Sequence, residues 1–331
     1  DYIRMYHHAI LLGITTLTSL DTANALADII ASRFNENNTE LVDINHLRTD
    51  KLKLNFIKMQ SCGNDYIFFD NMDGKITCPE SLAINFVDRH YGIGGDGITL
   101  IEKSDVADAK MRIFNKDGSE GAMAGNSIRC VAKYLFDNGL VKDKNITIET
   151  LSGVKELQLY TFNGKVSSVS VDMGKAVLDG KSIPSTLEGE TVVGRKISIG
   201  GQDYTVTLVN VGNPHCVVFC DKVDAVDVAN VGPMFEYAEY FPQRINAEFV
   251  RVVNDKTLKM RVWERGNGET LACGTGAAAS VVAAVLNGYC KQDEDITVKV
   301  RGGDLIVRYS SDGSVRLTGS VKQVFEGTVE Y

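Results

Sequence analysis

Two stretches of the sequence, residues 115–130 and 264–280, repeat one pattern: a turn of small residues followed by an apolar run typical of a helix. Cys273 follows Ala124 by 149 residues and occupies the matching position, and each apolar run ends in Asn-Gly. This repeat predicts a duplicated fold in which two homologous domains meet across one cleft. The alternative is a chance similarity, because glycine-rich entries to helices are common.

The remaining pattern predicts the α+β class. From about Lys53 onward, short β-rich runs dominate, and helical stretches interrupt them only at residues 79–90, 127–139 and 276–289, with a weaker one at 224–238. Many strands with few helices favour mostly antiparallel sheets over alternating strand–helix units.

Composition excludes several classes of protein. With 331 residues, 44 % of them apolar, the chain suits two domains of ordinary size. A net charge of -8 argues against nucleic-acid binding, and no apolar run is long enough to span a bilayer. The seven cysteines are scattered without CxxC pairs, a pattern typical of reduced thiols in a cytoplasmic protein rather than of disulfides or a zinc site.

Residues 1–52 read as a separate appendage. The pattern predicts a strand at 9–17, a helix at 19–34 and a strand at 40–44. The apolar run near the N-terminus only weakly resembles a signal peptide, because Gly13 and two threonines interrupt it. The sequence assigns this segment no function.

The two helix starts predict a chemistry. A cysteine in the first turn of a helix, such as Cys273, is expected to have a lowered pKa, because the helix dipole and free N–H groups stabilise its thiolate. The same backbone N–H groups form a cradle for a carboxylate. Two such helices aimed at one point could place a thiol on each face of the carbon attached to that carboxylate. Inverting a stereocentre needs a base on one face and an acid on the other.

Six motifs, in order along the chain from about Leu54 to the C-terminus, together resemble the diaminopimelate epimerase family. They are residues 56–70, 88–97, 112–130, 211–219, 241–250 and 263–280. The resemblance implies two pseudo-symmetric domains, each a mostly antiparallel sheet or barrel wrapped around a central helix, with the active site between them. It places the domains at 53–172, with a last strand at about 320–331, and at 173–319.

The resemblance also implies an activity. The family converts LL-diaminopimelate into the meso isomer with two cysteines and without pyridoxal phosphate or metal, in lysine and peptidoglycan biosynthesis. Homodimerisation is a further expectation from the family. The implied catalytic positions are Cys273, Ala124 in place of the second cysteine, Glu264 and His215. The implied substrate-binding residues are Asn64, Asn115, Gly125, Asn126, Asn213, Asn246, Glu264, Arg265, Gly274 and Thr275.

Two positions depart from the family. Gly97, which follows "GIGGD", stands where a polar amide is common, and this leaves open a racemase of another amino acid such as histidine. Ala124 cannot carry a proton, so the chain as written should turn over poorly. Because its cradle is intact and the chain starts without Met, the sequence favours an engineered Cys→Ala change. A catalytically dead amino-acid-binding protein is the other alternative.

Several features have simpler interpretations. Cys130, in the middle of a predicted helix, is typical of a core residue, and the other cysteines apart from Cys273 are expected to be structural. "GIGGDG" matches a dinucleotide-binding pattern, but a predicted helix precedes it and a strand follows, which is the reverse of the required context.

Overall fold

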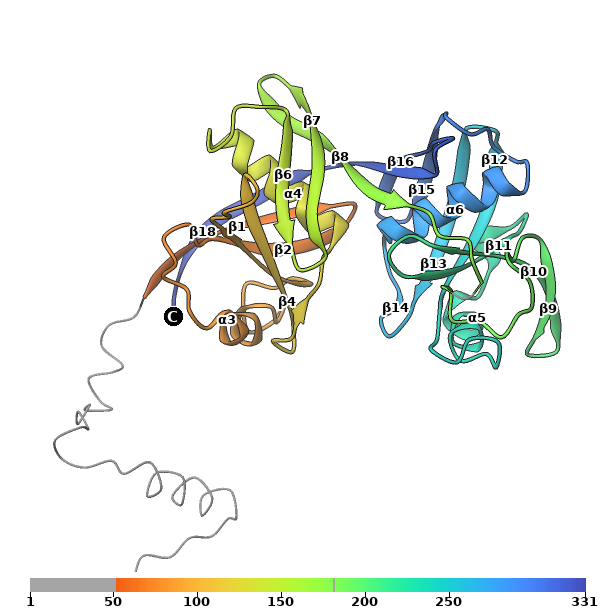
Figure 1. Cartoon of the computed structure of the whole chain (residues 1–331). Coiled ribbons are helices and arrows are strands. Elements are labelled where there is room, and N and C mark those ends of the chain that lie inside the picture. Colours follow the sequence, from red (N-terminus) through yellow and green to blue (C-terminus); the bar gives the residue numbers. More distant parts are fainter. Residues whose placement is uncertain (1–51, 181) are drawn as a thin grey trace, which may run out of the picture. The chain divides into compact units, whose positions relative to one another are not determined.

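A computed structural model of the chain describes residues 52–180 and 182–331 (Figure 1). The strands and helix expected within residues 1–51 lie outside the described residues. The remainder, from Lys53 to Tyr331, forms one compact unit.

The first half of this unit contains eight strands and two helices. They are β1 (Lys53–Ser61), β2 (Asn64–Asp70), α3 (Pro79–Phe86), β3 (Gly97–Glu102), β4 (Ala109–Asn115), β5 (Glu120–Gly121), α4 (Gly125–Asp137), β6 (Asn145–Thr150), β7 (Gly153–Phe162) and β8 (Lys165–Lys175).

The second half repeats this order. Its elements are β9 (Arg195–Ile199), β10 (Gln202–Asn210), β11 (Pro214–Phe219), the short 3-10 helix η1 (Val223–Ala225), α5 (Val228–Glu236), β12 (Asn246–Asn254), β13 (Thr257–Glu264), β14 (Gly268–Glu269), α6 (Gly274–Leu286), β15 (Asp295–Val300), β16 (Gly303–Tyr309) and β17 (Ser314–Ser320). A final strand, β18 (Lys322–Glu330), follows.

The strand pairings of the two halves are the same. In the first half β1–β2, β3–β4, β6–β7 and β7–β8 are antiparallel, while β2–β3 and β4–β6 are parallel. In the second half β10–β11, β12–β13, β15–β16 and β16–β17 are antiparallel, while β11–β12 and β13–β15 are parallel. The expected α+β fold of two similar, mostly antiparallel halves is confirmed, and the repeat in the sequence is a repeat in topology.

Two strand pairings connect the halves. β8 continues past the expected limit at residue 172 and pairs with β17, with Val171 opposite Leu317. β18 then returns to the first half and pairs with β1, with Leu54 opposite Val329. The last strand of the chain therefore completes the sheet that the first described strand begins.

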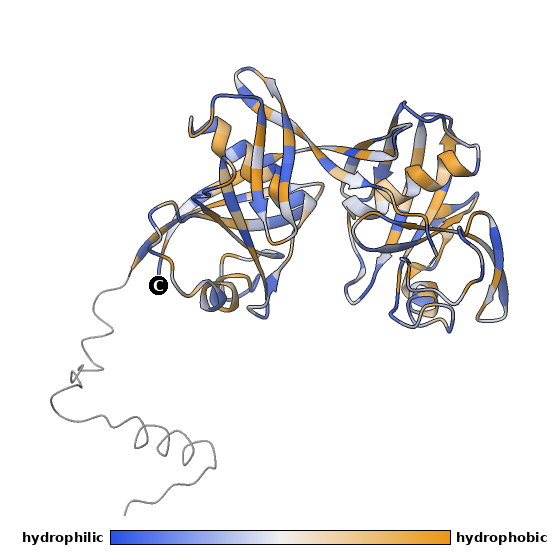
Figure 2. Ribbon diagram, in the orientation of Figure 1, coloured by the Kyte–Doolittle hydropathy of each residue, from blue (hydrophilic) through white to orange (hydrophobic). Residues whose placement is uncertain are grey.

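Each half is built around one central helix, and the helix of the second half is the more apolar of the two. All residues from Gly276 to Ala284 of α6 are buried, and its sequence is apolar on every side (Figure 2), as expected for a helix enclosed by a sheet. Its alanines allow strands to pack closely on all sides. α4 fills the same place in the first half, where Ile128, Cys130 and Val131 enter the core. Cys130 is thus a core residue, as expected.

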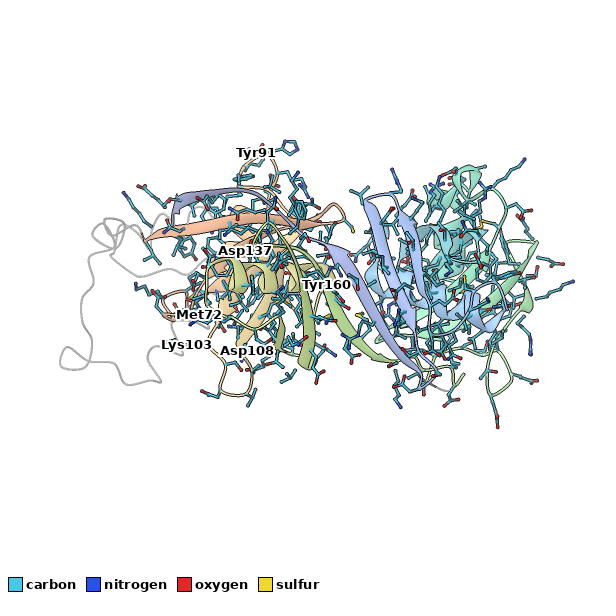
Figure 3. All side chains as sticks on the ribbon, turned by 90° about the horizontal axis from the view of Figure 1, so that it is seen from above. Met72, Tyr91, Lys103, Asp108, Asp137 and Tyr160 are labelled. Carbon is cyan, nitrogen blue, oxygen red and sulfur yellow. The ribbon has the colours of Figure 1, made fainter. Side chains whose placement is uncertain are left out.

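α3 ends earlier than the sequence predicted. It begins at Pro79, a residue suited to the first turn of a helix, and stops at Phe86 instead of residue 90. The Asp88 carboxylate accepts hydrogen bonds from the N–H groups of His90 and Tyr91, which favours a turn over a further helical turn. Tyr91 is 95 % exposed on the resulting loop (Figure 3). This loop leads directly into β3, so no helix follows the "GIGGDG" segment.

Candidate active site

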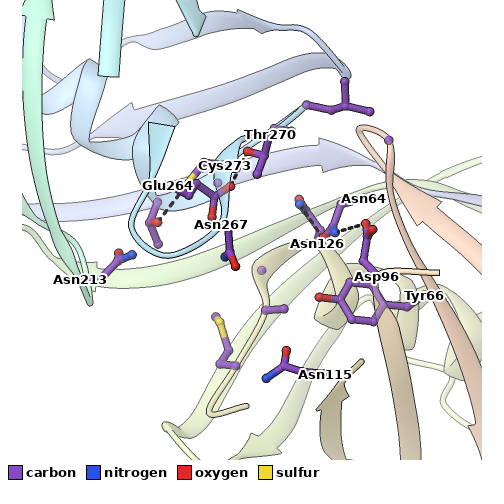
Figure 4. A pocket seen from close by; sticks show the side chains of 18 of the residues that line it. Asn64, Tyr66, Asp96, Asn115, Asn126, Asn213, Glu264, Asn267, Thr270 and Cys273 are labelled. Atoms are coloured by element: carbon purple, nitrogen blue, oxygen red, sulfur yellow. Dashed lines mark hydrogen bonds between the residues drawn. The ribbon is translucent and has the colours of Figure 1, made fainter. Parts of the chain in front are cut away.

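A cavity of about 870 Å³ is lined by residues of both halves, including the first residues of α4 and α6 (Figure 4). Many of the site residues implied by the sequence lie on its wall. These are Asn64, Asn115, Ala124, Gly125, Asn126, Asn213, Glu264, Cys273, Gly274 and Thr275.

The two helix starts have the same backbone geometry. Ala124 precedes α4 with φ -133° and ψ 116°, and Cys273 precedes α6 with φ -120° and ψ 114°. The Cys273 sulfur accepts a hydrogen bond of 3.3 Å from the Gly276 N–H and lies 3.4 Å from the Thr275 hydroxyl. The methyl group of Ala124 makes no such bond. The chain therefore presents one thiol to a cavity whose wall has two equivalent positions.

The pKa of Cys273 is raised, not lowered as the sequence suggested. Burial is the main cause, and the carboxylates of Glu264 and Glu248 add to it. The hydrogen bonds from Thr275 and Gly276 act in the opposite direction but are outweighed. Near neutral pH, Cys273 is therefore a thiol and able to donate a proton.

Glu264 lies at the end of β13 and faces the cavity. Its pKa is also raised, chiefly by burial, although the hydroxyl of Thr270 donates a hydrogen bond to it and offsets part of this shift. A carboxyl group with a raised pKa beside a thiol can exchange protons with bound groups more readily than an ordinary surface carboxylate.

His215 lies behind the cavity wall. It is completely buried, with Nδ1 2.7 Å from Glu248 Oε1 and Nε2 2.8 Å from Asn213 Oδ1. Its connection to the cavity is through Asn213, which lines it. The sequence pattern did not identify Glu248, because it stands alone in an apolar strand.

Two further expected site residues, Asn246 and Arg265, do not line the cavity. Asn246 is buried, donates to the carbonyl oxygen of Pro214 at 2.7 Å and accepts from the backbone N–H of Arg265 at 2.9 Å. The Arg265 side chain is exposed, and its Nη1 donates to the carbonyl oxygen of Gln243 at 3.1 Å. Asn246 therefore holds the loop that carries Arg265.

Tyr66 is a cavity residue that the sequence analysis missed. It corresponds to His215 in the repeat, since each stands two residues after a cavity asparagine, and this spacing was the signal that could have found it. Burial, with a contribution from Asp96, raises the pKa of Tyr66 to about 12, so its hydroxyl is neutral.

The same tyrosine explains Gly97. A Cβ atom at Gly97 would lie 2.5 Å from the Phe114 carbonyl oxygen and 2.7 Å from the Tyr66 ring. No larger side chain fits there without displacing one of them. The Tyr66 ring thus occupies space that a side chain at position 97 would need.

A charged network borders the cavity in the first half. Arg89 donates to Asp65 Oδ2 and to Asp96 Oδ1, both at 3.0 Å, and Lys58 Nζ lies 2.7 Å from Asp65. Arg89 and Asp96 both line the cavity. The sequence analysis did not single them out, because their pairing depends on how the loop after α3 folds back.

Within residues 52–180 and 182–331, no group of three or more histidine, cysteine, aspartate or glutamate residues could hold a metal ion. In the same residues, no helix is long and apolar enough to cross a bilayer.

Comparison with known proteins agrees with this geometry. The sequence matches the family described as diaminopimelate epimerase over residues 56–178 and 207–324. A diaminopimelate epimerase of Methanococcus maripaludis strain C5 is 46 % identical over 278 residues, covering 84 % of this chain and 100 % of the relative. The diaminopimelate epimerase of Acetivibrio thermocellus is 47 % identical over 278 residues, covering 84 % and 99 %.

Solved structures with the same fold are more distant. A hydroxyproline epimerase of Agrobacterium vitis aligns with a TM-score of 0.62 at 14 % identity, over 85 % of this chain and 92 % of that one. A PhzF-family phenazine biosynthesis protein of Bacillus anthracis also aligns with a TM-score of 0.62 at 14 % identity, over 84 % and 99 %. These likenesses support the fold, while the sequence matches decide the family. The chain belongs to the diaminopimelate epimerase family.

Proposed function

We propose that the active site of this chain is built to convert LL-diaminopimelate into the meso isomer by proton transfer between two opposed thiol positions. The observation that carries the proposal is the pair of matching helix starts at Ala124 and Cys273 on the wall of one cavity. A reaction that needs a proton donor and a proton acceptor on opposite faces of one carbon uses both positions.

In the proposed reaction a thiolate on one side removes the α-hydrogen as a proton. The electron pair of the broken C–H bond moves toward the carboxylate, and a thiol on the other side returns a proton to the carbon. Backbone N–H groups of Gly125, Asn126, Gly274 and Thr275 would hold the carboxylate and stabilise the charge that develops on it. Glu264 and Asn64 would bind the adjacent amino group, and His215 would assist the proton balance of the thiols.

The second amino-acid end of the substrate would be held by Asn115, Asn213, Asn246 and Arg265. Of these, Arg265 would have to leave the Gln243 carbonyl oxygen to reach a carboxylate in the cavity. Asn246 would act indirectly, through the loop that it anchors.

Ala124 makes the reaction incomplete. A methyl group neither accepts nor donates a proton, so the chain should fail to return a proton on that face. Once its own proton has passed to Glu264 or His215, Cys273 alone could still remove and replace the α-hydrogen of one stereoisomer.

Two alternatives remain within the same fold. A racemase of another amino acid, such as histidine, is favoured by Gly97, where a polar side chain is missing. A protein that binds an amino acid without catalysis is favoured by Ala124.

We further propose that the protein works in the cytoplasm without pyridoxal phosphate or metal and serves lysine and peptidoglycan biosynthesis. It would act on a small amino acid and on neither nucleic acid nor membranes. We also propose that the protein forms a homodimer and that the limits of its two domains lie near residues 172 and 320.

The test compares the chain with its Ala124→Cys variant, using LL-diaminopimelate and chiral chromatography of the product. Ala122→Cys is the matched control, because residue 122 also lines the cavity but is not the residue directly before α4. We expect meso product only with Ala124→Cys. If none of the three proteins forms it, the substrate assignment is wrong, and activity of Ala124→Cys on a panel of other amino acids would then separate a different racemase from a binding protein.

A further inference from the structure

Arg129 is a completely buried cation without an acidic partner. Its Nη2 donates to Ser61 Oγ at 2.8 Å and to Asn126 Oδ1, and its Nε donates to Ser61 Oγ at 3.3 Å. The remaining nitrogen, Nη1, is buried with no hydrogen-bond partner among the described residues. None of the ion pairs in that part of the chain includes Arg129. Its partners are a hydroxyl and an amide, and neither neutralises its charge.

The position of this charge is electrostatically unfavourable. Arg129 lies in the second turn of α4, and its Nη1 lies close to the helix start, because a Cβ atom built on Gly125 would be 3.9 Å from it. The positive end of the helix dipole is at the same place, and the first turn of α4 contains no acidic residue. Burial lowers the pKa of Arg129. A buried charge that lacks an opposite charge costs stability unless something else compensates it.

The fold makes a dedicated space for the guanidinium group. A Cβ atom at Gly319 of β17 would lie 2.8 Å from Cζ, Nε and Nη2 of Arg129, so only glycine permits this packing. Ser61, which binds the guanidinium, donates in turn to the carbonyl oxygen of Ser320 at 2.6 Å. Strands of both halves thus enclose Arg129.

Arg129 also determines the orientation of two side-chain amides on the cavity wall, those of Asn126 and Asn64. An arginine can only donate, so Asn126 presents Oδ1 to it and Nδ2 to Asn64 Oδ1, at 3.1 Å. At the other end an aspartate can only accept, so Asn64 presents Nδ2 to Asp96 Oδ2, at 2.6 Å. The chain of bonds between Asn126, Asn64 and Asp96 is visible in Figure 4. Each Nδ2 retains a second N–H, so both amides can offer donors to an anion.

The second half has the opposite arrangement. Ala278 stands where the repeat would place a counterpart of Arg129, and the start of α6 packs against a buried acid, since a Cβ atom at Gly276 would lie 2.7 Å from Glu248 Oε1. The start of α4 therefore has a buried cation beside it, whereas the start of α6 has a buried acid.

We propose that Arg129 is a positioning residue that makes the start of α4 the stronger of the two carboxylate-binding cradles. It orients the Asn126 amide and supplies the buried positive charge that a bound carboxylate group neutralises. That the ligand is an amino-acid carboxylate rests on the proposed function. The effect of Arg129 on the electrostatic potential at position 124 is independent of that function.

The first test uses a thiol at position 124 as a probe of that potential. In an Ala124→Cys background, Arg129→Met removes the charge, Arg129→Lys retains it, and Arg112→Met removes a charge elsewhere in the first half. The pH dependence of iodoacetamide alkylation at position 124 is followed by peptide mass spectrometry. We expect the midpoint to rise by about one pH unit with Arg129→Met and to change little with the other two. An unchanged midpoint with Arg129→Met overturns the proposal, whatever the substrate.

The second test measures calorimetric affinity for LL-diaminopimelate in the chain with Ala124. We expect Arg129→Met to weaken binding about tenfold or more and Arg129→Lys to stay within about threefold. Equal affinities for all variants would overturn the carboxylate role. If the parent chain does not bind diaminopimelate while the alkylation midpoint still shifts, the proposed function fails but the charge role of Arg129 stands. Thermal unfolding checks each variant, and Arg129→Gln replaces Arg129→Met if the latter does not fold.

Discussion

The starts of α4 and α6 have nearly the same backbone geometry but different electrostatic surroundings. Behind α4 lies the buried Arg129, and no acid stands in the first turn of that helix. Beside α6 lie Glu264 and the buried Glu248, which raise the pKa of Cys273. The duplication kept the geometry of the helix start on both sides, and the charges around it differ. This division suits a reaction in which one side must accept a proton while the other donates one.

Structural residues diverged less than cavity residues. Arg112 pairs with Glu120 at 2.7 Å in the first half, and Arg261 pairs with Glu269 at 2.8 Å at the equivalent place in the second. On the cavity wall, Asn115 corresponds to Glu264 and Asn126 to Thr275. The ion pairs are thus retained in both halves, whereas these cavity positions differ between them.

The largest effect should come from moving the thiol from one half to the other. The chain as given should exchange the α-hydrogen of one diaminopimelate stereoisomer in deuterated water. A double variant, Ala124→Cys with Cys273→Ala, should exchange that of the other, with a reversal of preference of about 10²-fold or more. Mass spectrometry of the recovered substrate measures both. If the two proteins label the same stereoisomer, the halves do not serve opposite faces of the carbon.

A smaller effect should follow from removing a charge beside Cys273. Because its raised pKa leaves little thiolate at neutral pH, its alkylation should be slow and should accelerate as the pH rises beyond the usual range of a thiol. Glu264→Gln removes one raising charge and should speed alkylation at pH 7.5 about tenfold. Peptide mass spectrometry follows the rate, with the exposed Cys78 as an internal control. An unchanged rate would mean that the charge of Glu264 does not contribute to the raised pKa of Cys273.

Two cations that directly follow the equivalent strands β4 and β13 should contribute differently to diaminopimelate binding. Arg265 and Lys116 are equivalent in the repeat, and Lys116 pairs with Asp88 at 3.2 Å. If Arg265 takes the distal carboxylate, Arg265→Ala should weaken diaminopimelate binding about 10- to 100-fold, and Lys116→Ala only a few-fold. Isothermal calorimetry distinguishes them. Equal losses, or a larger loss with Lys116→Ala, would contradict the role assigned to Arg265.

The smallest effects should come from the two equivalent ion pairs. Arg112→Met should reduce the free energy of unfolding by about 0.5 kcal/mol, as expected for a partly exposed pair. Arg261→Met should cost about 1–2 kcal/mol, because Arg261 also donates to the carbonyl oxygen of Val226 at 2.6 Å. Urea unfolding measures the difference. A greater loss with Arg112→Met would show that the two pairs do not play equivalent roles in their halves.

Much of the fold could be predicted from the sequence because it depends on local patterns. The apolar runs and glycine-rich entries located α4 and α6, and their spacing indicated that the fold is duplicated. The motifs also indicated ten residues of the cavity wall, because these residues lie at the ends of strands and the starts of helices. The end of α3 was missed, since it depends on hydrogen bonds that Asp88 makes in the loop after it.

The sequence by itself determined the repeat, the class of fold and the family. It also showed that only one of the two equivalent helix-start positions carries a thiol. Only the tertiary structure decided the charges that these positions experience. Burial, Glu264 at the end of β13 and Glu248 in β12 together raise the pKa of Cys273. That Arg129 has no acidic residue beside it is evident only from the side chains that surround it in the fold. Electrostatic interactions depend on distance through space and on burial, and a sequence pattern specifies neither.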